Sequence, residues 1–453
     1  MGLSVIILAA GQGTRMCSDL PKVLQLLAGR PMLAHVLDTS RKLGAGDIVV
    51  VYGYGGELVP HTCGGDGSRW VQQAEQLGTG HAVQQAMPET PDANQVLVLY
   101  GDVPLLTVAT LQRLIGATAE NEVSLLTVDL DDPAGYGRII RVDGNVTAII
   151  EEKDATEKQR AVKEINTGVM IASGKKLRDW INAIDNNNAQ GEYYLTDVVA
   201  SAVADGTTVN AVKANDRVEV MGINDKKQLA EAERALQIRQ VDELMQQGVG
   251  FADPSRVDIR GKLICGKDVF IDVNAVFEGD VSLGNGTRIE SNNLIRDSDL
   301  GVGTIVHSNC HLEGAVTGDN CEIGPFARLR PGAVLANNVK IGNFVEIKKS
   351  TIAAGSKVNH LTYIGDAEIG TDVNVGAGTI TVNYDGANKH RTTIGDNASI
   401  GSGVNLVAPI EVGAGATIGA GSTITKPVPD GQLVLERSKQ VSVPGWKRPT
   451  KKK

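Results

Sequence analysis

A glycine-rich turn near the N-terminus carries the first residues that could do chemistry. Residues 8–16 are Leu-Ala-Ala-Gly-Gln-Gly-Thr-Arg-Met; they follow an apolar run and precede Pro21 and Lys22. Glycines let backbone N–H groups approach an anion closely, and Arg15 and Lys22 place two cations behind them. Met16 stands where a dinucleotide-binding turn has its third glycine, and no Gly-Lys-Ser/Thr follows. The pattern fits either a plain tight turn or a turn that binds a triphosphate.

A carboxylate comes directly after a second apolar run. Asp102 follows residues 96–101, which are Val-Leu-Val-Leu-Tyr-Gly. Ligands gather at the carboxyl ends of parallel strands, and Mg²⁺ prefers one or two carboxylates together with phosphate oxygens and water. Alone, an aspartate two residues before a proline would fit a simple turn. Together with the glycine-rich turn, Asp102 indicates a metal and triphosphate site.

His360 and Tyr363 interrupt a regular repeat in the second half of the chain. A lone histidine in such a place is most often a solvated surface residue. An acyl transfer to an amine, however, needs a base that works near pH 7, and imidazole is the natural choice. Arg330 and Lys348 are 18 positions apart, so we expect a coil of about this length to stack them on one face, where they could clamp a sugar phosphate.

The elements that must position the first site alternate in type up to about residue 226. The predicted strands are residues 5–10, 48–52, 95–100 and 123–128, with amphipathic stretches between them. This alternation predicts right-handed βαβ units and a mostly parallel, Rossmann-like sheet. Residues 226–247 have apolar residues at helical spacing, and Gly248 follows as a stop. We therefore expect a first domain at 1–226, a linker helix at 227–248 and a second domain at 249–453.

Beyond residue 250 the apolar period changes to six, and this is the strongest signal in the chain. The repeating residues are Ile271, Phe277, Leu283, Ile289, Ile295, Ile323, Leu329, Leu335, Ile341, Ile347, Ile394, Ile400, Leu406, Val412, Ile418 and Ile424. Such a hexapeptide repeat predicts a parallel β-helix, in which each six residues form one face of a coil and the apolar residue fills a narrow interior. Glycine often follows, as in Gly395, Gly401 and Gly419, and we expect these glycines to serve the corners. A narrow interior also explains why the chain has few aromatic residues (Phe 5, Trp 3, Tyr 8).

Three features depart from the repeat. Phe277 is aromatic, and Val276 is an alternative inward residue in these early coils. Steps of five residues, such as Ile347 to Ile352, shift the register, and residues 381–391 interrupt it altogether. An interruption of a solenoid predicts a loop outside the coil, and such loops are often functional. Coils of this type commonly pack as threefold homo-oligomers, which is an analogy and not a consequence of the repeat.

The composition excludes several classes of protein. With 453 residues, 42% hydrophobic and 21% charged, the chain fits two or three folded domains and not a disordered or fibrous protein. A net charge of −9 argues against nucleic acid as a partner, and no apolar run approaches the ~18 residues of a membrane span. Five cysteines without a close pair suit a cytoplasmic protein. The basic residues 447–453 are either a solvated tail or an arm that attracts anions.

Four motifs, in order ahead of the hexapeptide half, resemble one known family. They are Leu-Ala-Ala-Gly-x-Gly-Thr-Arg-Met with Pro-Lys, Gln-Leu-Gly-Thr-Gly-His-Ala (76–82), Tyr-Gly-Asp-Val-Pro-Leu (100–105) and Asn-Asn-Ala-Gln-Gly-Glu-Tyr-Tyr-Leu-Thr-Asp (187–197). Over essentially its whole length the chain resembles the bacterial bifunctional N-acetylglucosamine-1-phosphate uridylyltransferases and glucosamine-1-phosphate N-acetyltransferases. The resemblance implies an α/β nucleotidyltransferase domain followed by a left-handed parallel β-helix, and a homotrimer. It also implies that the product, UDP-N-acetylglucosamine, serves peptidoglycan and lipopolysaccharide precursors.

For the first half the resemblance implies uridylyl transfer, in which N-acetylglucosamine 1-phosphate attacks the α-phosphorus of UTP and pyrophosphate leaves. Asp102 and Asn224 would hold Mg²⁺, and Arg15 and Lys22 would meet phosphates. The implied residues that bind UTP or the UDP-sugar are Leu8, Ala9, Ala10, Gly11, Arg15, Lys22, Gln73, Gly78, Thr79, Tyr100, Gly101, Asp102, Gly137, Glu151, Asn166 and Asn224. Among them Gln73, Gly78 and Thr79 would read uracil, and Gly137, Glu151 and Asn166 would line the sugar. Position 12, commonly lysine in the family, is glutamine here, which could weaken triphosphate binding.

For the second half the resemblance implies that His360 is the general base that activates the 2-amino group of glucosamine 1-phosphate for attack on acetyl-CoA. The sugar phosphate would be held by Arg330, Lys348, Tyr363 and Asn374. Acetyl-CoA would contact Ala377, Asn383, Tyr384, Ser402, Ala420 and Arg437. Asn383 and Tyr384 fall inside the external loop that the broken period predicts independently.

Two other hypotheses remain open at this stage. One is a nucleotidyltransferase with a single activity, whose β-helix serves only oligomerisation and regulation. The other is a scaffold that binds nucleotide sugars without turning them over. His307 and His311 could suggest zinc, but no third histidine with suitable spacing accompanies them, so we expect no metal there.

Overall fold

The computed structural model describes residues 2–65 and 67–451. Two compact units, Met1–Leu236 and Gln237–Lys453, divide inside the long helix α8 (Lys226–Gln246). The helix predicted at 226–247 is therefore present. The domain limits expected at residues 226 and 248 coincide with its two ends, and they stay a prediction. Among the described residues no helix is both long and apolar enough to cross a membrane.

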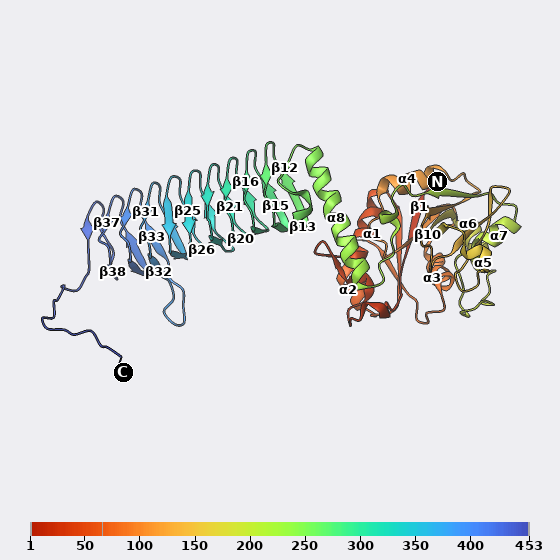
Figure 1. Cartoon of the computed structure of the whole chain (residues 1–453), viewed down its shortest axis with the longest axis horizontal. Helices are drawn as coiled ribbons and strands as arrows, with labels where there is room; N and C mark the ends of the chain where they lie inside the picture. The colour runs from red at the N-terminus through yellow and green to blue at the C-terminus, as the bar shows by residue number, and fades with distance from the viewer. Residues whose placement is uncertain (1, 66, 452–453) are drawn as a thin grey trace. The chain divides into compact units, whose positions relative to one another are not determined.

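The first unit is built on one mixed sheet, with strands in the order β11-β7-β10-β6-β1-β4-β5 (Figure 1). The strands are β1 (Leu3–Ala9), β4 (Asp47–Tyr52), β5 (Arg69–Gln72), β6 (Gln95–Tyr100), β7 (Val123–Asp129), β10 (Glu164–Ser173) and β11 (Val209–Lys213). All pair in parallel except β10, which runs antiparallel to both of its neighbours. A hairpin of β8 (Arg138–Val142) and β9 (Asn145–Ile150) extends from β10. All four predicted strands are present in a mostly parallel sheet.

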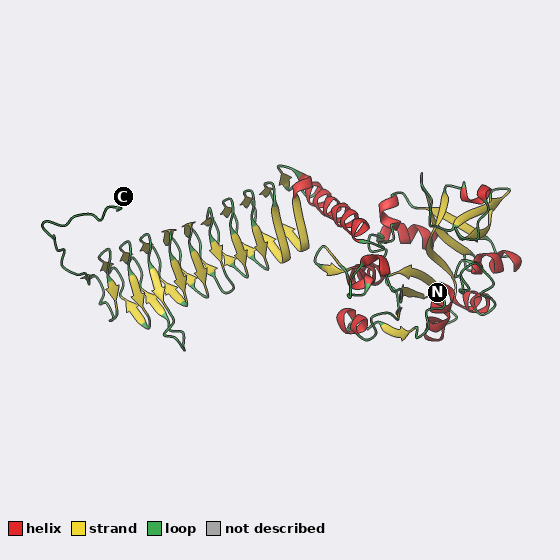
Figure 2. Cartoon of the chain, turned by 60° about the horizontal axis from the view of Figure 1, so that its bottom comes forward, coloured by secondary structure: helices red, strands yellow, loops and turns green. Residues whose placement is uncertain are grey.

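Helices cover both faces of this sheet (Figure 2). The helices of this unit are α1 (Met32–Lys42), α2 (Leu58–Cys63), α3 (Thr79–Ala86), α4 (Val108–Gly116), α5 (Glu157–Arg160), α6 (Gly174–Ile181) and α7 (Asp197–Ala204), and all but α5 contribute to the two cores. Val5 and Ile7 of β1 share one core with residues of α1 and α4, whereas Ile6 and Leu8 share the other with residues of α3, α6 and α7. Successive side chains of a strand point to opposite faces, so a strand covered on both faces is apolar throughout. This explains the continuous apolar run that opens the chain.

The second unit is a parallel β-helix, most of whose coils contribute three short strands (Figure 1). One face is an eleven-stranded sheet: β12 (Gly250–Phe251), β14 (Phe270–Ile271), β16 (Arg288–Ile289), β19 (Ile305–Val306), β22 (Glu322–Ile323), β25 (Lys340–Asn343), β28 (Lys357–His360), β31 (Asn374–Val375), β34 (Ser399–Ile400), β37 (Thr417–Ile418) and β39 (Leu433–Val434). A seventeen-stranded sheet supplies the other two faces: β13 (Val257–Cys265), β15 (Ala275–Leu283), β17 (Leu294–Arg296), β18 (Asp299–Leu300), β20 (His311–Glu313), β21 (Val316–Thr317), β23 (Arg328–Leu329), β24 (Val334–Leu335), β26 (Glu346–Lys348), β27 (Thr351–Ile352), β29 (Tyr363–Gly365), β30 (Ala367–Ile369), β32 (Ile380–Val382), β33 (Thr392–Ile394), β35 (Asn405–Val407), β36 (Ile410–Val412) and β38 (Thr423–Ile424).

The sixteen in-phase apolar residues all point into this interior, and none is more than 3% exposed. Phe277 is among them at 1%, whereas Val276 is half-buried, so Val276 is not the inward residue. The ring of Phe277 shares its core with Val241 and Leu244 from the last turns of α8. The aromatic side chain therefore lies in the first coils, where helical side chains complete the core.

The glycines that follow the apolar residues lie at the corners as expected, each between the end of a strand and the turn that follows it, but a left-handed backbone is not the reason. Gly395, Gly401 and Gly419 do not have the positive φ that would favour glycine. A Cβ at Gly401 would instead lie 2.5 Å from the backbone nitrogen of Ala420 in the next coil. The absence of a side chain lets neighbouring coils approach closely. The corners with positive φ are formed by other glycines and by several asparagines and aspartates, which tolerate this conformation better than other residues.

A loop leaves the β-helix between β32 and β33, as the broken period predicts (Figure 1). Residues 383–391 form it, and an isolated bridge between Tyr384 and Lys389 closes it as a hairpin. The next coil resumes in register, with Ala367 beside Thr392. The loop is therefore an insertion into one coil and does not disturb the stacking around it.

Replacing Phe277 with alanine should lower the free energy of unfolding by ~3–5 kcal/mol, because a large side chain would be removed from a packed interior. Val276→Ala, on the same strand, is the matched control and should cost less than ~1 kcal/mol. Urea unfolding followed by far-UV circular dichroism measures both. Equal losses for the two variants would contradict the inward assignment of Phe277.

Candidate functional site

Parallel pairing brings the glycine-rich turn and Asp102 together in the first unit. Leu8 of β1 lies beside Tyr100 of β6, and the N–H of Gly101 donates to the Leu8 carbonyl at 2.9 Å. Because parallel strands end at one edge, the residues that follow β1 and β6 emerge side by side. On the far side of β1, Gln73 follows β5, and its N–H donates to the Tyr52 carbonyl at the end of β4 at 2.8 Å.

A pocket of about 300 Å³ opens at this edge. Ten of the predicted residues line it: Leu8, Ala9, Ala10, Gly11, Lys22, Gln73, Gly78, Thr79, Tyr100 and Asp102. Val23, Gln76, Ala82 and Glu192 complete the lining and were not predicted. Gln76 and Glu192 belong to the second and fourth sequence motifs, so the motifs contained them without singling them out. Six predicted residues lie outside the lining: Arg15, Gly101, Gly137, Glu151, Asn166 and Asn224.

Lys22 lines the pocket together with Asp102. Its Nζ forms an ion pair with Asp102 Oδ2 and also donates to Asn224 Oδ1 at 3.1 Å. The Asp102 and Lys22 side chains are largely buried. One carboxylate oxygen and one amide oxygen therefore converge on a single cation, although Asp102 and Asn224 are far apart in sequence. The Asp102 carbonyl also accepts from the N–H of Ile223 at 2.9 Å, which holds the Asn224 segment beside it.

Arg15 lies apart from this ion pair. It is exposed on the short helix Thr14–Met16, and its charge acts on Tyr136. Burial raises the pKa of Tyr136, the negative charge of Asp102 raises it further, and Arg15 opposes both effects. The arginine and Asp102 thus both act on Tyr136, although neither Arg15 nor Tyr136 lines the pocket. Gln12 of the same turn donates to Gln76 Oε1 at 3.1 Å, so the glutamine links the turn to another wall of the pocket.

The side of the pocket predicted for the base is held by hydrogen bonds and close packing. Gln73 is 3% exposed, and its Nε2 donates to the Gly78 carbonyl and to His81 Nδ1 at 3.0 and 3.1 Å. Gly78 has a φ of 109°, and a Cβ there would lie 2.6 Å from the Tyr193 carbonyl oxygen. Thr79 begins α3, and its Oγ1 accepts from the Leu195 N–H at 3.1 Å. Both donors of the Gln73 amide are used within the protein.

The three residues predicted to line the sugar gather beside Tyr100. The N–H of Asn166 donates to the Gly137 carbonyl at 2.8 Å, and a Cβ at Gly137 would lie 3.3 Å from Glu151 Oε1. Thr196 Oγ1 donates to the same carboxylate oxygen at 3.1 Å. Burial raises the pKa of the Tyr100 hydroxyl, and the charge of Glu151 raises it further. The group forms one polar cluster next to the pocket.

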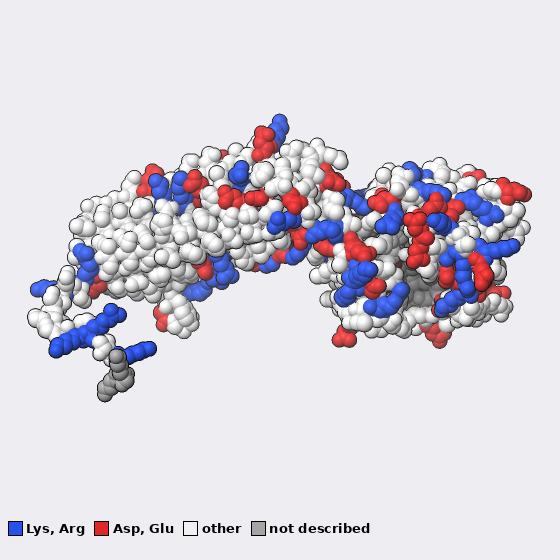
Figure 3. Space-filling view, in the orientation of Figure 1, with Lys and Arg blue, Asp and Glu red and all other residues white. Residues whose placement is uncertain are grey.

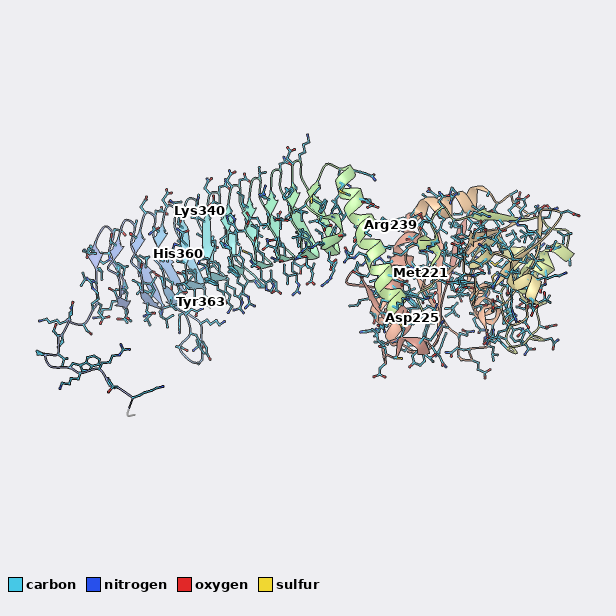
Figure 4. The ribbon with its side chains drawn as sticks, in the orientation of Figure 1. Met221, Asp225, Arg239, Lys340, His360 and Tyr363 are labelled. Carbon is cyan, nitrogen blue, oxygen red and sulfur yellow. The ribbon has the colours of Figure 1, made fainter. Side chains whose placement is uncertain are left out.

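A second site lies on the β-helix around His360 (Figure 4). Its Nδ1 lies 2.8 Å from Oδ1 of Asn343, the residue beside it in the previous coil. A groove of about 530 Å³ runs along this corner and is lined by Gly324, Pro325, Phe326, Gly342, Asn343, Phe344, Asn359 and His360. Asn343 was not predicted, because the expected spacing between stacked residues was 18 positions, whereas the spacing in this coil is 17.

A group of cations lies on the β-helix next to the external loop (Figure 3). Lys348 and Arg330 are near each other, as the spacing of 18 predicts, since β23 and β26 pair in register. Lys389 from the external loop joins them, and its ammonium lowers the pKa of Lys348. Arg330 donates to Glu346 at 2.8 Å, and this hydrogen bond raises its pKa. Lys389 was not predicted, because only the folded loop returns it to this face.

Tyr363 and Asn383 join this cationic group. Asn383 Nδ2 donates to Asp366 Oδ2 at 2.6 Å and to the Tyr363 hydroxyl oxygen at 3.4 Å. Tyr384, next in the loop, is 56% exposed, and its hydroxyl donates to the Gly386 carbonyl at 2.6 Å. Asn374 lies apart, on β31 beside Lys357 of the previous coil. Asn383 is thus tied to Tyr363, whereas Tyr384 faces outward.

Three of the residues predicted for acetyl-CoA continue a column that starts at His360. The column consists of His360, Ala377, Ser402 and Ala420 in successive coils. Three backbone hydrogen bonds fix the register of this column. They run from the N–H of Gly378 to the His360 carbonyl at 3.2 Å, from Gly403 to Ala377 at 2.7 Å and from Gly421 to Ser402 at 2.8 Å. Arg437 lies past the end of the column, where its Cδ is 3.9 Å from the Cβ position of Gly421. Small residues along one edge leave an open strip that begins at the imidazole.

Comparisons with known proteins agree on both halves of the chain. Residues 5–164 match the MobA-like NTP transferase domain, and residues 314–349 and 391–426 match the bacterial transferase hexapeptide (six repeats). The chain is 55% identical over 452 residues to the bifunctional protein GlmU of Azoarcus sp. (strain BH72), with 100% of both chains covered. It is 54% identical over 453 residues to that of Acinetobacter baumannii (strain ACICU), again with 100% of both covered. The GlmU protein of Herminiimonas arsenicoxydans is 53% identical over 449 residues and 99% of each chain.

The buried carboxylate of Glu151 makes the stability of the first unit depend on pH. Burial raises the pKa of Glu151, the nearby Asp197, Asp154 and Glu192 act in the same direction, and only the Thr196 hydrogen bond opposes them. A group whose pKa is raised by folding contributes stability below its unfolded pKa, and this contribution is lost as the pH rises through the folded pKa. Glu151→Gln should therefore increase the free energy of unfolding at pH 7, with a gain that vanishes toward about pH 4.

Urea unfolding of the full chain at the two pH values measures this effect. The control is Glu120→Gln, which changes an exposed glutamate and should shift the free energy of unfolding by less than ~0.5 kcal/mol at either pH. A Glu151→Gln variant that is less stable than the wild type at pH 7, and equally so at pH 4, would contradict the prediction.

Proposed function

The chain belongs to the family of bifunctional GlmU proteins, and we propose how its residues divide two transfer reactions between two sites. It is a transferase that joins a nucleotidyltransferase half to a hexapeptide-repeat acyltransferase half, with uridylyltransferase and acetyltransferase activities. The β-helix transfers an acetyl group from acetyl-CoA to glucosamine 1-phosphate, which releases coenzyme A. The sheet unit then transfers a uridylyl group from UTP to N-acetylglucosamine 1-phosphate, which releases pyrophosphate. The product of the first reaction is the acceptor of the second.

In the sheet unit the reaction needs positioning and charge neutralisation and no protein nucleophile. The sugar phosphate oxygen attacks the α-phosphorus of UTP as the bond to pyrophosphate breaks. Lys22 and Arg15 neutralise phosphate charge, and the glycine-rich turn offers N–H groups. Because both Nε2 donors of Gln73 are engaged, its Oε1 is the atom that accepts from N3–H of uracil. Holding both substrates in line can supply ~7–11 kcal/mol.

Mg²⁺ fits the oxygens beside Lys22. The Asp102 carboxylate and the Asn224 amide oxygen already converge on one cationic nitrogen, and Mg²⁺ takes a few protein oxygens with phosphate oxygens and water. Among the described residues no group of three His, Cys, Asp or Glu side chains could hold a metal by itself, so substrate phosphates would complete the shell. Bound Mg²⁺ would stabilise the charge that develops on the phosphates. Lys22 would then turn from Asp102 toward a phosphate.

On the β-helix, His360 accepts a proton from the amine of glucosamine 1-phosphate. The amine nitrogen attacks the thioester carbonyl, the C–S bond breaks, and the thiolate of coenzyme A takes up a proton. Arg330, Lys348 and Tyr363 hold the sugar phosphate, with Asn374 as a more distant contact. Acetyl-CoA lies along the column of small residues toward Arg437, with Asn383 and Tyr384 beside it. General base catalysis of this kind contributes ~10²–10⁴-fold in rate.

A homotrimer and a cytoplasmic location are part of the proposal. The match to the hexapeptide repeat and the continuous faces of the β-helix support packing of several copies. All five cysteines are free thiols, which suits a reducing compartment. The observation that carries the proposal is the concentration of the expected residues at two places, one around Lys22 and Asp102 and one around His360. A nucleotidyltransferase with a purely structural β-helix would show no release of free thiol from acetyl-CoA. A binding scaffold would turn over neither substrate pair.

His360→Ala should lower kcat for acetyl transfer by ~10²–10⁴-fold and leave uridylyl transfer unchanged, because the base is lost from only one site. Free thiol released from acetyl-CoA and pyrophosphate released from UTP are measured separately. The matched control is His307→Ala, which removes a histidine of the same β-helix that pairs with Glu290 at 3.2 Å. Acetylation by His360→Ala at the wild-type rate would show that the base is assigned wrongly.

Asp102→Asn should do the reverse: pyrophosphate release that depends on Mg²⁺ falls by at least ~100-fold, because a charged ligand and the partner of Lys22 are lost together. Acetyl transfer should persist. Asp129→Asn is the control, since Asp129 also ends a parallel strand of this sheet but is exposed and pairs with Lys213 at 2.6 Å. Unchanged Mg²⁺-dependent release would remove Asp102 from the metal site.

A further inference from the structure

We propose that Asn343 is a positioning residue for acetyl transfer: it holds His360 in the tautomer whose Nε2 can accept the proton. This inference rests on the function proposed above for His360. The hydrogen bond between the two side chains carries it, because Nδ1 of His360 lies 2.8 Å from Oδ1 of Asn343. An amide oxygen only accepts hydrogen bonds, so Nδ1 must carry the proton. A neutral imidazole has one N–H, and Nε2 therefore keeps its lone pair.

The backbone keeps the two side chains in register. Asn343 ends β25, His360 ends β28, and the two lie side by side in the parallel pair. The N–H of Leu361 donates to the Asn343 carbonyl at 3.1 Å, directly after the histidine. A Cβ at Gly342 would collide with the carbonyl oxygen of Asn359, so glycine is needed for the two coils to come this close. The amide and the imidazole meet because the coils are stacked tightly at this point.

The corner after Asn343 is also fixed. Phe344 has a φ of 55°, a left-handed conformation that is unfavourable for a bulky residue and persists only where the surroundings enforce it. Its ring stacks on that of Phe326, with centroids 5.3 Å apart and planes at 19°. Both rings line the groove beside His360. Asn343 therefore lies between a glycine that permits close approach and an aromatic pair that holds the turn.

An amide suits this role better than a carboxylate. A carboxylate at Nδ1 would stabilise the imidazolium and keep the base protonated at a higher pH, whereas an amide sets the tautomer without adding charge. The charged side chains on the strands packed here are Lys340 of β25 and Lys357 of β28, and β31 brings the neutral Asn374. Across the turn that follows His360, Tyr363 begins the next strand, and Lys348 and Asp366 lie near the end of that strand. None of these strands places an acidic group beside the ring.

The test compares Asn343→Ala, Asn343→Asp, Lys340→Ala and His360→Ala in the full chain by steady-state acetyl transfer over a range of pH. Asn343→Ala should lower kcat by ~10–100-fold, the usual effect of removing an outer partner of a functional histidine, while KM for both substrates stays within about twofold. Asn343→Asp can still accept from Nδ1, so it should recover most of kcat at high pH. Its carboxylate should move the acid limb of the pH profile to higher pH. Lys340→Ala, on the same strand (Figure 4), is the control and should keep the wild-type kcat and pH profile.

The outcomes separate this inference from the proposed function. Wild-type kcat in Asn343→Ala, while His360→Ala is inactive, would overturn the role of Asn343 and leave the base in place. Active His360→Ala would overturn the proposed base and this inference with it. Should Asn343→Ala fail to fold by circular dichroism, the aspartate variant decides: an unshifted acid limb would overturn the inference. Uridylyl transfer, measured in every variant, should remain at the wild-type rate.

Discussion

The interior of the β-helix admits only a narrow column of side chains, and this limit governs the second unit. Most coils turn through three short strands in 17 or 18 residues; the coil that carries the inserted loop is longer, and the last coil has 16. Every strand must place an apolar residue inward and leave its neighbours outward. Coils that share one shape stack in register, so an outward residue lies beside its counterpart in the next coil. Asn343 and His360 meet for this reason, and so do Arg330 and Lys348.

Close stacking has a second consequence for the site. Where a coil carries glycine after its inward residue, as at Gly342 and Gly401, the next backbone approaches nearly to contact. Small residues such as Ala377 and Ser402 then form an open strip along one edge, whereas charged side chains gather on the neighbouring face. The column of small residues and the group of cations therefore lie on either side of one histidine. The inserted loop adds Asn383 and Lys389 without changing the coil that carries it.

In the sheet unit, the order of the strands brings residues together that are distant in the sequence. The residues after β1, β5 and β6 share one edge of the sheet because these strands run parallel with β4 between β1 and β5. Lys22 bridges Asp102 and Asn224, and a backbone hydrogen bond from Ile223 to Asp102 holds the two segments together. The pocket is polar around Lys22, whereas its opposite wall is held by Gln73. Charge and shape are therefore supplied by different loops of one edge.

The sequence alone determined the architecture, because period and composition report which residues must be buried. Alternating apolar runs predicted the sheet, and the period of six predicted the β-helix and its loop. It could not decide what depends on contacts between distant segments: that Phe277 and not Val276 points inward, that glycines such as Gly401 allow close stacking of the coils, and that Asn343 lies beside the imidazole. These three features follow from the length and packing of the coils. A coil that is one residue longer or shorter brings different side chains together. Residue types are local properties of the chain, but the hydrogen bond that sets the tautomer of His360 exists only once two coils are stacked.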